Sequence, residues 1–167
     1  MDNQSDKDHC QPLASSTLPG ADLSSHLGGD RTNGLFHHRL QTLSAMIAGP
    51  APPGNRQARD LLHALCISLL YYLAENEPPE RQNAAVMLRA VTDALEGQES
   101  AGPSGLDLMF IGTKENDSEA WQAYKTYNEL AQNATRKERE AALFYLGARL
   151  QTILAAAPLP ETPEAPL

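Results

Sequence analysis

Apolar residues recur at the spacing of an α-helix in every long segment between residues 35 and 157. Residues 56–76 constrain the fold most, because their leucines together with Cys66 sweep about half of a helical wheel. A helix with so wide an apolar arc must be covered by other elements on several sides. We therefore predict an all-α fold, a single-domain bundle of about five helices with this helix at its centre.

The other four helices are predicted from the same period and from the residues at their ends. Asp117 or Ser118 is suited to cap the fourth helix, and Thr135 with Glu138 forms a capping box that opens the fifth. Asn55 is expected to cap the central helix. The expected helices cover residues 35–48, 56–76, 79–96, 118–133 and 136–157.

Three segments lack a helical period. Residues 1–34 are rich in Ser, Asp, Gly and Asn, and we expect them to form a disordered acidic tail. Residues 158–167 form a second expected disordered tail, rich in Pro and Glu. The short apolar segment 106–111 is expected to be extended or a single turn laid across the helices. The predicted domain is therefore residues 35–157.

The charge and the apolar runs limit the partners and the compartment. The chain carries 21 acidic and 13 basic residues, a net charge of −8, which disfavours binding to phosphate backbones without excluding it. The longest apolar run, 61–74, is interrupted by His63 and Ser68 and is shorter than the about 20 residues of a membrane span. The N-terminus lacks the basic and apolar regions of a secretion signal. We expect a cytoplasmic protein without membrane insertion.

The second half of the chain carries a recognisable pattern. A short apolar segment ends in Phe-x-Gly, an EAWxxY helix follows, and a charged helix start leads into a final apolar helix. Residues 106–157 thereby resemble a family of small bacterial helical domains of unknown function. The resemblance implies a bacterial origin and a helical fold, and it implies no catalytic residue. The matching residues are Phe110, Gly112, Glu119, Ala120, Trp121 and Tyr124.

Neither a metal site nor a catalytic site is predicted. His63 and Cys66 are the only suitably spaced pair of metal ligands, and zinc needs three or four. We prefer to place Cys66 in the core with His63 at its edge. The carboxylates at 115–119 are explained by the helix start that follows them. We therefore expect no cofactor, no metal and no catalytic residue, although an active site assembled in space stays open.

Arg136, Lys137 and Arg139 lie in the first turn of the last helix, where cations oppose the helix dipole. One interpretation is a contact with an anionic partner, either nucleic acid or an acidic protein surface. The other, which we favour, is a solvated turn in which Glu138 and Glu140 compensate the charge.

A second apolar stripe lies on the same helix. Phe144 projects outside the predicted core face, and Ala141, Ala148 and Ala155 share its side. We expect the helix at 35–48 or residues 106–111 to cover this stripe. If it is exposed, it is the best candidate for contact with a partner. Tyr71 on the central helix is a weaker candidate of the same kind.

These observations lead to three hypotheses. The first is a non-enzymatic protein that acts through protein contacts, as an adaptor, a regulator or a homo-oligomer. The alternative is a nucleic-acid-binding regulator that uses Arg136, Lys137 and Arg139. The third is an enzyme whose site is not visible in the sequence.

Overall fold

The computed structural model describes residues 20–50, 56–97, 102–113 and 118–156. The all-α prediction is confirmed, but these residues form seven α-helices and one short 3-10 helix instead of about five helices. No helix among them is long and apolar enough to cross a membrane. The elements are α2 (Ser24–Leu27), α3 (Gly34–Ala48), α4 (Arg56–Asn76), η2 (Pro79–Arg81), α5 (Ala84–Glu96), α6 (Gly105–Ile111), α7 (Glu119–Gln132) and α8 (Arg136–Ala156).

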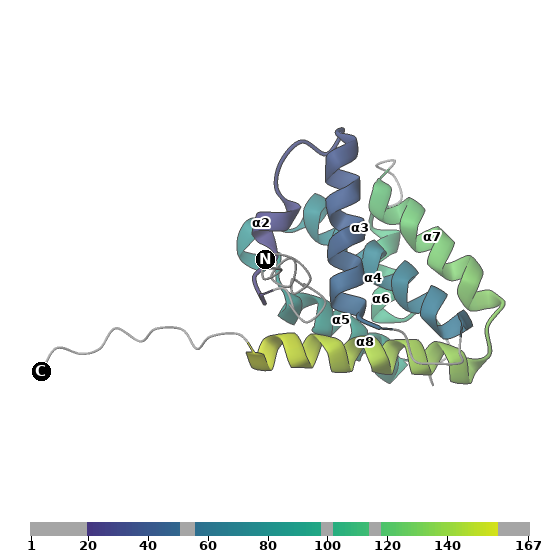
Figure 1. Ribbon diagram of the computed structural model, residues 1–167. Coiled ribbons are helices and arrows are strands. Elements are labelled where there is room, and N and C mark those ends of the chain that lie inside the picture. The colour runs from purple at the N-terminus through teal and green to yellow at the C-terminus, as the bar shows by residue number, and fades with distance from the viewer. Residues whose placement is uncertain (1–19, 51–55, 98–101, 114–117, 157–167) are drawn as a thin grey trace, which may run out of the picture.

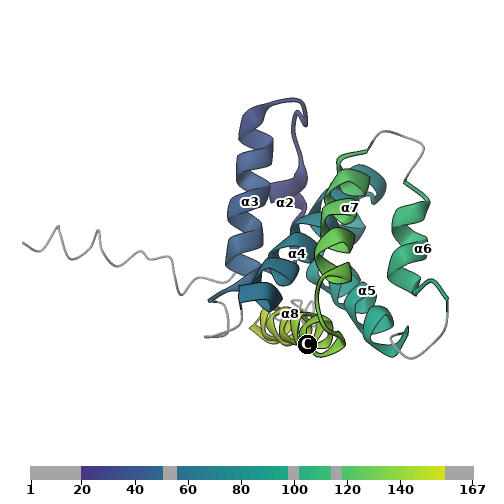
Figure 2. The same cartoon turned by 90° about the vertical axis from the view of Figure 1, so that its right-hand side faces the viewer.

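Helix α4 occupies the centre, as its wide apolar arc predicts. It packs against α3, α7 and α8, and it also contacts α2. Helices α3 and α6 lie on opposite sides of it, and α8 runs across the base of the molecule (Figures 1 and 2). Leu61, Leu65 and Leu70 are fully buried here. One core therefore joins the seven α-helices of the described residues.

The signals at the helix ends act as predicted. The Ser118 hydroxyl accepts a hydrogen bond from the Trp121 backbone N–H at 2.9 Å. Thr135 and Glu138 form the expected capping box, each side chain accepting from the other residue's backbone N–H. The predicted inner face of α7 is buried at Tyr124 and Tyr127. The predicted roles of Asn55, Asp117 and Ala157 lie outside the described residues.

The predicted third helix is wrong at its start. Residues 79–81 form the separate turn η2, and α5 begins only at Ala84, where the Asn83 side chain caps it. The break occurs because Gln82 turns back toward α4. Its Nε2 donates to the carbonyl oxygens of Leu73 and Glu77, at 3.2 and 3.0 Å, near the last turn of that helix.

The prediction of a disordered tail over residues 1–34 is wrong for residues 20–34. Leu23 and Leu27, four residues apart, are both buried in the core. The Leu23 N–H donates to the Gln82 carbonyl, and the Ala84 N–H donates to the Ala21 carbonyl. Burial and these backbone bonds hold the segment against the start of α5. Residues 1–19 and 158–167 lie outside the described part of the chain.

The prediction of an extended segment or single turn at 106–111 is also wrong. These residues form the capped helix α6, in which Ser104 and Asp107 make a capping box. The Phe110 ring stacks on Tyr124 with centroids 4.1 Å apart and makes an edge-to-face contact with Tyr72, with centroids 5.5 Å apart. Stacking between two buried rings explains why so short a helix is held in place.

Charged side chains from other helices cap several helix ends, among them the start of α7 and the end of α3. The Glu75 carboxylate accepts from the backbone N–H groups of Glu119 and Ala120, both at 3.0 Å, at the start of α7. Arg149 donates to the carbonyls of Met46 and Ile47 at the end of α3. These bonds satisfy backbone groups that a helix leaves unpaired at its ends.

Replacing Glu75 with Ala tests this long-range cap. The change leaves two N–H groups at the start of α7 without their carboxylate, so we expect the free energy of unfolding to fall by about 1–2 kcal/mol. Urea unfolding measures it. The control is Glu80→Ala, an exposed carboxylate on η2, which should change stability by less than about 0.5 kcal/mol. Equal effects of the two changes would contradict the cap.

Candidate functional site

The outer face of α8 carries the predicted second apolar stripe, and it is exposed. Phe144 is 68% exposed, and Ala141, Ala148 and Ala155 are also exposed. We call these four residues the Phe144 stripe. The expectation that residues 35–48 or 106–111 cover it is wrong, because α3 meets α8 at the opposite, inner side near Arg149 and α6 packs on α5 and α7.

Few large apolar side chains are exposed in the described ranges. Besides Phe144 they are Leu35 at the start of α3 and Leu108 and Ile111 on α6. Phe144 is the aromatic member of this group, and small residues flank it along its helix. The Phe144 ring therefore protrudes between small side chains, and such a surface suits packing against another helix.

The three basic residues of the predicted anion contact do not form one patch. The Arg136 Nε lies 2.8 Å from the Glu140 carboxylate. Arg139 turns inward and donates from Nη1 to the carbonyls of Ala131 and Ala134, at 3.1 and 2.8 Å, where it caps α7. Lys137 is exposed. Two of the three cations are thus engaged within the protein.

Tyr71 is not available to a partner. It is only 8% exposed, and its hydroxyl lies 2.6 Å from His37 Nδ1 on α3. The residue joins α4 to α3, so its proposed role as a contact on the surface is wrong. The hydrogen bond between the Tyr71 hydroxyl and His37 was not predicted from the sequence.

Cys66 lies in the core, as the preferred interpretation predicted. Burial raises the pKa of its thiol to about 12, so the sulfur is protonated at neutral pH and is a poor metal ligand. Its Sγ faces the Ser44 carbonyl at 3.9 Å. Among the described residues, no three His, Cys, Asp or Glu side chains are grouped to hold a metal.

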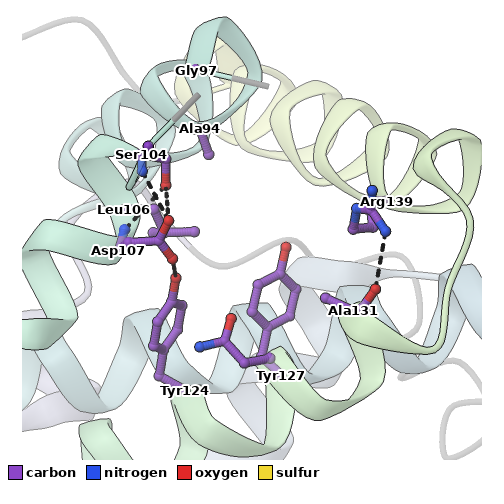
Figure 3. A pocket seen from close by; sticks show the side chains of 11 residues that line it. Ala94, Gly97, Ser104, Leu106, Asp107, Tyr124, Tyr127, Ala131 and Arg139 are labelled. Carbon is purple, nitrogen blue, oxygen red and sulfur yellow. Dashed lines mark hydrogen bonds between the residues drawn. The ribbon is translucent and has the colours of Figure 1, made fainter. Parts of the chain in front are cut away.

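A polar pocket of about 230 Å³ lies where the end of α5 meets α6, α7 and the start of α8 (Figure 3). This pocket is not predictable from sequence patterns, because its residues come from four elements. Its polar lining is Ser104, Asp107, Tyr124, Tyr127, Asn128 and Arg139.

Asp107 forms one wall of this pocket. Its Oδ2 accepts from the Ser104 N–H and hydroxyl, at 2.8 and 2.9 Å, and its Oδ1 accepts from the Tyr124 hydroxyl. Burial and this hydrogen bond raise the pKa of Tyr124 far above its usual value. Tyr124 therefore stays a donor, which keeps the Asp107 carboxylate in position.

Tyr127 reaches into the pocket between Asp107 and Arg139. The residue is 6% exposed, and burial raises the pKa of its hydroxyl to about 12, with the charge of Asp107 acting in the same direction and Arg139 in the opposite one. The hydroxyl is thus protonated at neutral pH and able to donate a hydrogen bond into the pocket.

The pKa of Tyr127 predicts a loss of stability in alkali. In the unfolded chain this hydroxyl ionises near pH 10.0, and in the folded protein only near 12. Its contribution is fully present below pH 10 and is lost as the pH rises toward 12, by about 2 kcal/mol. Tyr127→Phe should make the fall in unfolding free energy over this interval shallower, as measured by urea unfolding. Tyr145→Phe, whose hydroxyl donates to Pro50 outside the pocket, is the control; identical slopes for the two variants would contradict the assignment.

No protein-family model, curated protein or solved structure matches this chain. The resemblance of residues 106–157 to small bacterial helical domains therefore stays a prediction.

Proposed function

We propose that this chain is a non-enzymatic helical protein that acts through protein contacts, and that its partner is a second copy of itself. The observation that carries the proposal is the 68% exposure of Phe144 on the outer face of α8, among exposed alanines. Aromatic residues are enriched at the centres of protein interfaces, where they bury large areas at small entropic cost.

The shape of the Phe144 stripe favours a helix as the contacting element. Ala141 and Ala148 lie about one helical turn on either side of Phe144. Small residues let a second helix approach closely, and the ring then fits into the space above an alanine. Such a surface is self-complementary if two copies of α8 cross with Phe144 of each copy over Ala148 of the other.

The distribution of charge along α8 favours an antiparallel pair. Lys137, like the other charged residues of its first two turns, lies N-terminal to the Phe144 stripe, whereas the outer face beyond Ala148 carries the uncharged Gln151 and Thr152. In a parallel pair the two Lys137 side chains would face each other. An antiparallel pair places each of them over an uncharged region and also opposes the two helix dipoles. The result is a two-fold interface, the commonest symmetry of oligomers.

The alternative of a nucleic-acid-binding regulator has less support. Arg136 pairs with Glu140, and Arg139 caps α7, so the predicted basic cluster does not present three cations to one phosphate backbone. The net charge of −8 also opposes such binding.

Phe144→Glu tests the self-association. We expect the unchanged protein to have about twice its chain mass of 18.1 kDa in analytical ultracentrifugation. The substitution places two carboxylates in the interface, and we expect it to raise the dimer dissociation constant by at least about 30-fold. The matched control is Leu35→Glu, because Leu35 is equally exposed, at 68%, but lies on α3.

Circular dichroism should show the same helical content in both variants, since neither side chain belongs to the core. A single-chain mass for the unchanged protein at concentrations up to about 1 mM would contradict the proposal. So would an equal loss of association in the Leu35→Glu control, because the contact would then not depend on the Phe144 stripe.

A further inference from the structure

The polar pocket at the meeting of α5, α6, α7 and α8 carries groups of opposite charge on two walls. Figure 3 shows Asp107 on one side, Arg139 on the other, and the Tyr127 hydroxyl directed into the space between them. These groups lie apart from the Phe144 stripe, so an inference about them is independent of the proposed function.

The Tyr127 hydroxyl has no hydrogen-bond partner in the described part of the chain, although the residue is only 6% exposed. Every side-chain nitrogen or oxygen there that is sealed from solvent does have a partner. The hydroxyl is therefore not sealed and meets the open space of the pocket. The hydroxyl of this largely buried residue is thus free to bond a group that enters the pocket from outside.

Arg139 offers further donors to the same space. Its Nη1 is used by the Ala131 and Ala134 carbonyls, and these bonds hold the guanidinium in place. A guanidinium carries five N–H donors in a planar fork that matches the two oxygens of a carboxylate. Arg139 and Tyr127 line the same pocket, so the remaining guanidinium N–H groups and the Tyr127 hydroxyl are donors of the kind that an anionic oxygen pair requires.

Asp107 supplies the opposite property. Its Oδ2 accepts two hydrogen bonds from Ser104, whereas its Oδ1 accepts one, from Tyr124. An ionised carboxylate oxygen has room for about two donors. Oδ1 is therefore able to accept one more hydrogen bond, and its charge favours a cationic donor.

We propose that this pocket binds a small zwitterion of the free amino-acid class, with its carboxylate on Arg139 and Tyr127 and its ammonium toward Asp107. A ligand that carried only a negative charge would be repelled by Asp107, and one that carried only a positive charge by Arg139. The volume of about 230 Å³ is smaller than that of sites for drug-sized ligands, which suits a single amino acid. Leu106 and Ala94 line the pocket beside the polar groups and are available to an apolar side chain.

The test is a calorimetric titration of the full chain with each of the common amino acids, at concentrations up to about 10 mM. We expect at least one of them to bind. Its carboxamide, which lacks the carboxylate, and its N-acetyl derivative, which lacks the ammonium, should each bind at least about ten-fold more weakly.

Tyr127→Phe removes the central hydroxyl and keeps the ring, so it preserves packing. We expect it to weaken binding of the same amino acid at least about ten-fold, whereas Tyr145→Phe should leave binding unchanged. Absence of heat and of any thermal stabilisation with all of the amino acids would overturn the proposal, as would equal binding by the carboxamide, by the N-acetyl derivative or by the Tyr127→Phe variant. None of these results depends on whether the chain is a dimer, which the Phe144→Glu experiment decides separately.

Discussion

The burial of α4 is the constraint on which the rest of the structure depends. Its apolar residues cover so much of its circumference that no single neighbour hides them, and α3, α7 and α8 pack around it. Leu61, Leu65 and Leu70 lose essentially all contact with solvent there, and each such burial stabilises the fold by about 1.5–3 kcal/mol. The positions of the outer helices follow from this requirement, and so does the exposure of the far side of α8, which faces away from α4.

Packing helices around a central one brings their ends against the sides of their neighbours, where water is excluded from some of the unpaired backbone groups. Side chains from other elements satisfy these groups. Glu75 does so for the start of α7, Gln82 for the end of α4, Arg139 for the end of α7 and Arg149 for the end of α3. These bonds fix the helices relative to one another. The bond from Arg139 also holds its guanidinium at the wall of the polar pocket, so one residue contributes to both fold and site.

The long helices were predictable because their signals are local. A helical period and a capping box such as Thr135 with Glu138 operate within a few residues. Helices α2 and α6 were missed because short helices are stabilised by tertiary contacts, although Ser104 and Asp107 at capping-box spacing offered a signal for α6. Periodicity also placed Phe144 outside the core face, but it does not reveal whether another element covers a face. The pocket was beyond prediction, since Asp107, Tyr127 and Arg139 meet only after α6, α7 and α8 have packed.

Native-state hydrogen exchange measured residue by residue tests the central role of α4 most directly. If the fold depends on its burial, the backbone amides in the middle of α4, from Leu65 to Leu70, should exchange only through global unfolding and be the slowest in the protein. The amides of the short helices α2 and α6 should exchange through smaller openings and at least about ten-fold faster. Exchange of the central α4 amides at rates equal to those of α6 would contradict the account.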